Sequence, residues 1–345
     1  MHRQMSTCDP SSALAMTSSQ WMKAGGSLDH YRSIHRCNTP APDRSIARDI
    51  AVDGQSTTFL MDVGSDLASE SVVMTLPTAS GRIRTTLCLS SQIGCAMGCE
   101  FCQTGTMGLL GNMTTAQIVA QHHAAVHDLG QSIDNIVFMG MGEPLDNVDA
   151  VLGAVDVLLD HNGPAIAAKG LSVSTVGHVP GLHQFIDATT SSPLCRIGLA
   201  ISLNAPSESI RRSIMPIARA WPMTDLLEAM MRWSDDPRRR PILIEYVLIP
   251  SVNDDPAHAE MIAAYLKGVR CKINVIPYNP RRDSPWPSPT ERSVSAMTAA
   301  LHDQGLFVRR RVTTGRRVFG ACGQLGGRRD GSRGRPIAVS TGATR

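Results

Sequence analysis

The feature that most constrains this chain is a run of three cysteines in a glycine-containing stretch, residues 86–108 (TLCLSSQIGCAMGCEFCQTGTMG). Cys95, Cys99 and Cys102 have the spacing C-x3-C-x2-C. Thiolates bind soft metals, and three thiolates this close in the chain can converge on one centre. A structural zinc ion would take a fourth ligand at a similar spacing, but no second cysteine pair follows in the sequence.

A cubane iron–sulfur cluster fits this count of ligands better. Such a cluster has four irons, which are normally bound by four cysteines. Three protein thiolates would leave one iron open, and an open metal position is a site for substrate chemistry. The motif therefore favours a 4Fe–4S cluster with one open iron, and zinc or simple packing cysteines remain the alternatives.

The length and composition allow one large α/β domain with appendages, because the chain has 345 residues of which 42% are hydrophobic. The formal net charge of +3 does not by itself indicate a nucleic-acid partner. Arginines gather locally, however, and predict either a solvated face with a basic tail or a surface that neutralises phosphates. These arginines are Arg238–Arg240, Arg309–Arg311, Arg316, Arg317, Arg328, Arg329, Arg333 and Arg335.

The sequence carries no pattern typical of secretion or of a membrane span. Its nine cysteines are irregularly spaced, unlike a secreted disulfide framework. No apolar run reaches membrane-spanning length, and the first twenty residues have no signal-type apolar core. We therefore expect a soluble cytoplasmic protein in a reducing compartment, where thiols and a cluster persist.

The hydrophobic pattern divides the chain into three parts. Residues 1–55 show poor periodicity and are expected to be a weakly structured N-terminal extension, whereas 57–63 and 70–76 read as strands. From residue 84, short apolar strands alternate with helical patterns such as 148–159, within a core over 56–326. A basic tail over 327–345 follows. The six apolar strands are expected at 84–89, 135–140, 171–175, 197–202, 242–249 and 272–277.

Six strand–helix units predict a parallel sheet with right-handed connections, as in a partial (β/α)6-type barrel. Chemistry in such barrels collects at the carboxyl ends of the strands. Polar motifs follow successive strands at that end, and each alone would be ordinary turn chemistry. They are the cysteine loop, Gly140–Asn147 with Gly142 and Glu143, Ser174–Gly177, Ser202–Ala205, and Tyr278-Asn279-Pro280.

These motifs resemble a known family. The form C-x3-C-x-F-C, with Phe101 before the last cysteine, resembles the signature of radical S-adenosylmethionine (SAM) enzymes. The run Cys88-Leu-Ser-Ser-Gln-Ile-Gly-Cys95 and the string Ala321-Cys322-Gly323-Gln324-Leu325 resemble the RlmN/Cfr family of RNA adenine methyltransferases, over about residues 56–326. The resemblance implies a 4Fe–4S cluster on Cys95, Cys99 and Cys102, and SAM as the second cofactor. The implied SAM contacts are Gly142, Glu143, Ser174, Ser202, Leu203, Asn204 and Asn279.

One of these positions departs from the family pattern. The family has Ser-Leu-His-Ala where this chain has Ser202-Leu203-Asn204-Ala205. An asparagine can donate and accept hydrogen bonds, but it cannot carry a proton. We therefore expect Asn204 to contact the cofactor rather than to shuttle protons.

The resemblance also implies the catalytic residues. Cys322 would take a methyl group from one SAM, and a radical from a second SAM would activate that methyl group for addition to the adenine ring. Glu70 would accept the ring proton, although an insert near 78–83 lengthens its spacing to Cys88. Cys88 would then attack the Cys322 sulfur, which releases the product and leaves a transient disulfide.

The resemblance implies methylation of the adenine C2 carbon in rRNA, with tRNA as a further substrate, because Gly-Glu-Pro at 142–144 is nearer the RlmN form. It implies RNA and an electron donor such as flavodoxin or ferredoxin as partners of a monomeric enzyme. The alternatives are Cfr-like methylation of C8, or the same chemistry on a non-RNA substrate, which the shortened N-terminal accessory region would favour. A non-enzymatic iron–sulfur or zinc module that binds nucleic acid is the alternative from another class.

Overall fold

Seven parallel strands form the centre of the computed structural model, which describes residues 9–36, 45–78, 80–281, 283–311 and 322–326. They lie side by side in the order β4-β7-β8-β9-β10-β11-β12. All six predicted apolar strands are present, and a short seventh strand follows them. The strands are β4 (Ile83–Cys88), β7 (Asn135–Phe138), β8 (Leu171–Thr175), β9 (Gly198–Ser202), β10 (Ile242–Leu248), β11 (Cys271–Pro277) and β12 (Val308–Arg310).

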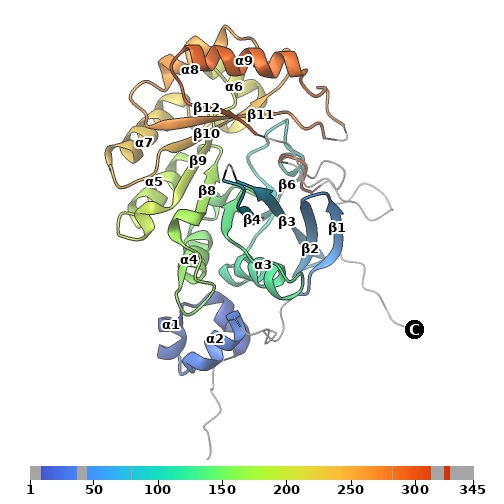
Figure 1. Cartoon of the computed structure of the whole chain (residues 1–345), viewed down its shortest axis with the longest axis vertical. Coiled ribbons are helices and arrows are strands. Elements are labelled where there is room, and N and C mark those ends of the chain that lie inside the picture. Colours follow the sequence, from blue (N-terminus) through green and yellow to red (C-terminus); the bar gives the residue numbers. More distant parts are fainter. Residues whose placement is uncertain (1–8, 37–44, 79, 282, 312–321, 327–345) are drawn as a thin grey trace, which may run out of the picture.

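Helices connect these strands and pack along the outer side of the curved sheet (Figure 1). The helix predicted at 148–159 has these bounds, and Val151, Ala154 and Leu158 on its inner side are fully buried. Among the described residues, no helix combines the length and apolar character that crossing a bilayer requires. The helices are α3 (Thr115–His127), α4 (Val148–Leu159), α5 (Val179–Ala188), α6 (Glu208–Ile214), α7 (Met223–Asp235), α8 (His258–Tyr265) and α9 (Glu291–Asp303).

An antiparallel meander precedes the parallel strands and extends the sheet beyond β4. It consists of β1 (Arg48–Asp53), β2 (Ser56–Gly64) and β3 (Leu67–Pro77), which confirms the two strands expected at 57–63 and 70–76. β3 pairs with β4 so that Val72 lies opposite Cys88. Because side chains alternate along a strand, Glu70 lies on the same face of the sheet as Val72.

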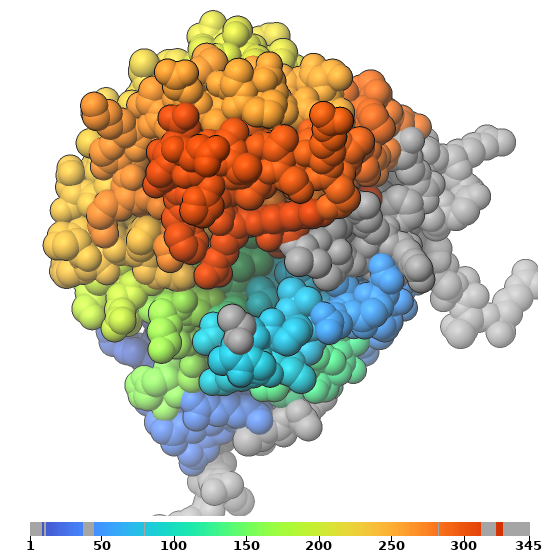
Figure 2. All heavy atoms as spheres, turned by 45° about the horizontal axis from the view of Figure 1, so that its top comes forward, coloured from blue at the N-terminus to red at the C-terminus, as the bar shows by residue number. Residues whose placement is uncertain are grey.

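The described strands form an open sheet, which confirms the predicted partial barrel. Their order begins at β1 and ends at β12, and these two edges do not pair with each other. In the space-filling view, the orange to red segments of α9 and β12 lie above the blue and cyan segments of β1–β4 on one face of the molecule (Figure 2). Sheet curvature thus brings the two ends of the strand order to the same side.

The expectation of a weakly structured stretch over 1–55 is wrong for its described residues. They form η1 (Pro10–Ala15), α1 (Ser18–Lys23) and α2 (Leu28–Arg36) before β1. Trp21 and Tyr31 are fully buried there. The Asp160 carboxylate, just after α4, accepts hydrogen bonds from the backbone N–H of Ser18 (2.5 Å) and from its hydroxyl (3.1 Å). These helices are stabilised by such tertiary contacts, which helical periodicity does not reveal.

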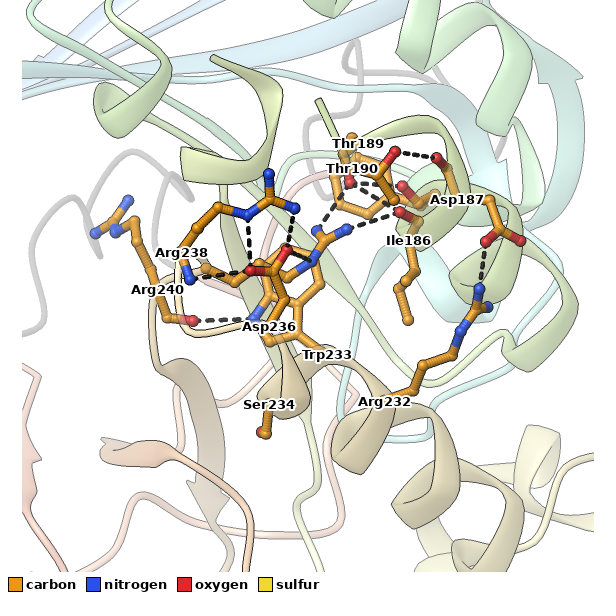
Figure 3. A network of polar contacts seen from close by, with 12 residues as sticks. Ile186, Asp187, Thr189, Thr190, Arg232, Trp233, Ser234, Asp236, Arg238 and Arg240 are labelled. Atoms are coloured by element: carbon orange, nitrogen blue, oxygen red, sulfur yellow. Dashed lines mark hydrogen bonds and ion pairs between the residues drawn. The ribbon is translucent and has the colours of Figure 1, made fainter. Parts of the chain in front are cut away.

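The arginine cluster at 238–240 lies in the loop before β10, at the amino ends of the parallel strands. Arg239 is 3% exposed, and its guanidinium lies 4.2 Å from the centre of the Trp233 ring. It donates hydrogen bonds to the Ile186 carbonyl (2.7 Å) and the Thr189 hydroxyl (3.0 Å), which end α5. Figure 3 shows Arg238 joined to Asp236, with the Arg240 guanidinium pointing away from that pair. Arg239 is therefore a structural link between α5, α7 and β10 rather than part of a phosphate-binding surface.

We expect Arg239→Met to lower the free energy of unfolding by about 2–4 kcal/mol, because it removes the buried guanidinium that bonds the Ile186 carbonyl and the Thr189 hydroxyl and packs on the Trp233 ring. Urea unfolding followed by circular dichroism measures this change. Arg238→Met is the matched control, since Arg238 is exposed and should not shift the unfolding midpoint. Equal midpoints for the two variants, with RNA affinity lost only in Arg239→Met, would instead assign Arg239 to RNA binding.

Candidate active site

A cavity opens at the carboxyl ends of the parallel strands, where the polar motifs were predicted to meet. It encloses about 940 Å³ of space not filled by protein atoms, part of it open to solvent. Residues from the cysteine loop, from the ends of β7–β11 and from the segment after β12 line it. The predicted site residues that line it are Cys95, Cys99, Cys102, Gly142, Glu143, Ser174, Ser202, Asn204, Asn279 and Cys322.

The cysteine loop is held by a small hairpin outside the main sheet. β5 (Gln92–Cys95) pairs with β6 (Gly108–Asn112), and Cys95 lies opposite Gly108. Gly94 has a φ of +71°, and a Cβ there would lie 1.9 Å from the Gly108 carbonyl oxygen. A Cβ on Gly105 would lie 2.8 Å from the Cys99 carbonyl oxygen. These two glycines therefore allow the backbone to turn tightly around the three thiols.

The three thiols lie close enough to one another to interact. Burial raises the pKa of Cys95, Cys99 and Cys102. The Cys102 thiol adds to the rise at Cys95 and Cys99, and the Cys322 thiol adds to the rise at Cys102. A positively charged metal centre would relieve this cost by binding the deprotonated sulfurs. Among the described residues, no three cysteine, histidine or acidic side chains converge on one point as ligands of a single ion.

Glu143 is held rigidly between the ends of β7 and β8. It is 2% exposed, and its two carboxylate oxygens accept the backbone N–H groups of Leu145 and Val176, each at 2.9 Å. Burial raises the pKa of Glu143 to about 7, and the two backbone hydrogen bonds oppose this shift. Gly142, with a φ of +96°, packs its Cα against Gln92, whose side-chain oxygen accepts the Glu143 N–H at 2.8 Å. A buried carboxylate at this position can bind an ammonium group.

The motif after β9 positions Asn204 by its backbone conformation. Asn204 has a φ of +58°, a left-handed conformation that asparagine adopts more easily than most residues. Its side-chain oxygen accepts the Val247 N–H at 2.9 Å, and its amide nitrogen lies 3.5 Å from the Met215 sulfur. Asn204 therefore joins β9 to β10 at the cavity wall. Ser202 lines the cavity, whereas Leu203 is fully buried behind it.

Residues 322–326 pack against the cysteine loop. The Gln103 N–H donates to the Gly323 carbonyl at 2.7 Å, and the Thr104 hydroxyl donates to the Leu325 carbonyl at 2.8 Å. On the other side, the Asn279 side-chain amide donates to the Cys322 carbonyl at 3.5 Å. These contacts place Cys322 in the cavity wall beside the loop of Cys102.

Cys88, the last residue of β4, is buried next to this wall. Burial, with a smaller contribution from the Cys322 sulfur, raises the pKa of its thiol to about 12, and the Arg311 guanidinium opposes this rise. The Cys88 thiol contacts the backbone of Met139, which lines the cavity. Cys322 thus lies near enough to Cys88 to influence it electrostatically, and both are free thiols. Glu70 is buried in β3 and does not line the cavity.

Two residues of this region were missed by the sequence reasoning. Glu245 lies in β10 and lines the cavity, with one carboxylate oxygen 3.3 Å from the Ser174 hydroxyl. A lone acid in the apolar run ILIEYVLI was the available signal. Arg311 forms an ion pair with Glu245 at 3.4 Å, whereas the sequence pattern groups it with Arg309 and Arg310 as a solvated face or a phosphate-neutralising surface. Two cysteines and six of the arginines named above lie outside the described residues. They are Cys8, Cys37, Arg316, Arg317, Arg328, Arg329, Arg333 and Arg335.

Comparison with known proteins agrees with this geometry. Residues 89–262 match the model of the radical SAM superfamily. The chain is 41% identical over 274 residues to a protein of Protochlamydia amoebophila named probable dual-specificity RNA methyltransferase RlmN 1, covering 79% of this chain and 74% of that protein. The dual-specificity RNA methyltransferase RlmN of Geobacter sulfurreducens is 38% identical over 309 residues, covering 88% and 81%. The chain belongs to the RlmN family of radical SAM RNA methyltransferases.

A solved structure of a related enzyme has the same fold as this chain. The crystal structure of a radical SAM methyltransferase from Sphaerobacter thermophilus superposes with a TM-score of 0.81 at 31% identity, covering 90% of this chain and 98% of that one. The family resemblance read from the sequence is thus confirmed. Membership of the radical SAM superfamily gives the enzyme a 4Fe–4S cluster and SAM as cofactors, and it excludes a non-enzymatic zinc module.

We expect replacement of Cys95, Cys99 and Cys102 by alanine to abolish binding of iron and sulfide while the barrel stays folded. The reason is that the loop lies on the β5–β6 hairpin, outside the ten-stranded sheet. Iron and sulfide analysis after anaerobic reconstitution, with a thermal melt followed by circular dichroism, measures both properties. Retained iron in the triple variant, or stoichiometric zinc without iron in the parent protein, would contradict the assignment of these ligands.

Proposed function

We propose that this enzyme methylates the C2 carbon of an adenine in RNA and that Cys322 carries the methyl group during the reaction. The observation that carries this proposal is the packing of residues 322–326 on the cysteine loop. This packing places Cys322 in the wall of the cavity that the cysteine loop also lines. Cys322 is also near enough to Cys88 to influence its pKa. Curated relatives of similar length are named dual-specificity RNA methyltransferases, which supports rRNA and tRNA as the substrates.

The cavity has a donor set that suits both cofactors. Cys95, Cys99 and Cys102 would hold the cluster, and the Glu143 carboxylate would hold the ammonium group of SAM. The remaining residues that we propose for the SAM site are Gly142, Ser174, Ser202, Leu203, Asn204 and Asn279. When bound, the two cofactors supply a transferable methyl group and a carbon-centred radical, which suits a ring carbon that is not nucleophilic.

The two cysteines divide the sulfur chemistry between them. Cys322, as a thiolate, accepts the methyl group and holds the resulting carbon through its sulfur. After this carbon has bonded to adenine, the Cys88 thiolate attacks the Cys322 sulfur. The new S–S bond forms as the S–C bond breaks, and the electron pair of the S–C bond passes to the released carbon, which takes up a proton from water to complete the methyl group. The two cysteines are oxidised to a disulfide, which a thiol reductant returns to two thiols.

Glu70 is the proposed acceptor of the adenine ring proton. Its side chain is buried in β3, on the same face as Val72, which pairs with Cys88. Its backbone carbonyl accepts the Ser90 hydroxyl at 2.6 Å, which ties this part of β3 to the start of the cysteine motif. Its position on the strand paired with Cys88 supports this proposed role.

The partners and setting follow from this chemistry. The cluster needs an electron donor, and we propose a flavodoxin or a ferredoxin in that role. A thiol pool that resets the disulfide is a property of the cytoplasm, where we place the enzyme as a monomer. We also propose that 56–326 is the catalytic core, that 1–55 is a shortened accessory region, and that 327–345 is a basic tail.

We expect Cys88→Ala and Cys322→Ala to fail at different stages. Without Cys88 the S–C bond to RNA cannot be broken, so purified Cys88→Ala should carry RNA bound covalently through Cys322. Without Cys322 no such bond can form. A denaturing gel of each variant, run with and without ribonuclease and followed by peptide mass spectrometry, separates the two outcomes.

Cys271→Ala is the matched control, because Cys271 is partly buried at the start of β11, at the end of the strand away from the cavity. It should carry no RNA and retain turnover. Normal turnover by Cys88→Ala, or an RNA adduct on Cys322→Ala, would overturn the assigned roles.

A further inference from the structure

Arg311 differs from the two arginines before it in the chain. Arg309 is exposed and lies 5.4 Å from the centre of the Phe307 ring, and Arg310 is exposed and pairs with Glu291 on α9. Arg311 follows β12 and is tied to β11, because its N–H donates to the Val275 carbonyl at 2.9 Å. Its side chain enters the barrel rather than joining a basic surface.

Inside the barrel, Glu245 fixes the Arg311 guanidinium. The Arg311 Nη1 lies 3.4 Å from the Glu245 Oε1 and 4.0 Å from the Met139 sulfur. The other Glu245 oxygen accepts the Ser174 hydroxyl at 3.3 Å, so the carboxylate is held from both sides. Glu245 is 6% exposed, and an ion pair with so little solvent around it has a well-defined geometry.

The fixed guanidinium lies beside both candidate catalytic sulfurs. Arg311 hydrogen-bonds to the Cys322 side chain, and the Cys322 sulfur is the main cause that raises the pKa of Arg311. Glu245 and Cys88 raise it further. Electrostatic attraction is reciprocal, and the same guanidinium opposes the rise in the pKa of the Cys88 thiol.

We propose that Arg311 is a positioning residue that holds the Cys322 sulfur next to Cys88 and keeps a fixed positive charge beside both sulfurs. Sulfur attacks carbon or another sulfur as an anion, so a fixed cation here serves methyl acceptance and disulfide formation alike. Glu245 keeps the Arg311 guanidinium in place. This inference rests on the roles proposed above for Cys88 and Cys322.

The test compares two alkylating agents on the cluster-loaded enzyme, kept anaerobic and without SAM or RNA. Iodoacetate is an anion and iodoacetamide is neutral, yet both react with the same thiolate. The ratio of their rates at Cys322, measured by peptide mass spectrometry, therefore cancels thiol ionisation and reports the local charge. We expect Arg311→Gln, which keeps an amide donor on a shorter side chain but loses the charge, to lower this ratio by about tenfold.

Two further variants complete the test. Arg311→Lys keeps the charge and should keep the ratio within about threefold of the parent enzyme. Arg310→Met removes an exposed arginine one residue away and should leave the ratio unchanged. An unchanged ratio in folded Arg311→Gln overturns the proposal. A tenfold loss of the ratio in Arg311→Lys also overturns it. The Lys variant therefore tests the proposal even if the Gln variant does not fold.

The outcome is separable from that of the proposed function. Alkylation needs neither methyl transfer nor RNA, so the ratio would still fall in Arg311→Gln if Cys322 were not the methyl carrier. Conversely, if Arg311 had no influence on the sulfur, Cys88→Ala would still trap RNA while the alkylation ratio stayed constant.

Discussion

The hydrogen bonds between the cysteine loop and residues 322–326 are the contact on which the rest of the site depends. They join segments 221 positions apart in the chain, at the Thr104 hydroxyl and the Leu325 carbonyl. The loop alone offers three thiols to a cluster, and the parallel strand ends alone offer a cofactor cavity. This contact brings a further thiol, Cys322, to the same cavity and next to Cys88, which turns a cofactor site into a site for sulfur-mediated transfer.

Much of the fold could be predicted from local pattern. Strands buried on both faces are nearly continuous apolar runs, so all six were found, as was the helix at 148–159. The short helices before β1 were not, because Trp21 and Tyr31 are buried in the core that residues of α3 and α4 also form, and Asp160 binds Ser18 across 142 positions. Contacts of that range leave no trace in periodicity.

The site was predicted where it depends on motif order, and missed where it depends on side-chain direction. Motifs at successive strand ends had to meet at one edge of a parallel sheet. A run of arginines, in contrast, does not say which member faces solvent. Arg239 is buried against Trp233, and Arg311 reaches Glu245, while Arg238 and Arg310 are exposed. The left-handed backbone of Asn204 likewise explains why asparagine suits that position, which sequence alone did not indicate.

The central claim is carbon methylation of adenine through Cys322, and the most direct test is mass spectrometry of nucleosides. RNA from cells lacking the enzyme would be incubated with the reconstituted protein, SAM labelled in its methyl group and a reductant, then digested and separated against synthetic standards. The account predicts labelled 2-methyladenosine with the parent enzyme and none with Cys322→Ala. Labelled 8-methyladenosine, label on a nitrogen, or equal product from Cys322→Ala would contradict it.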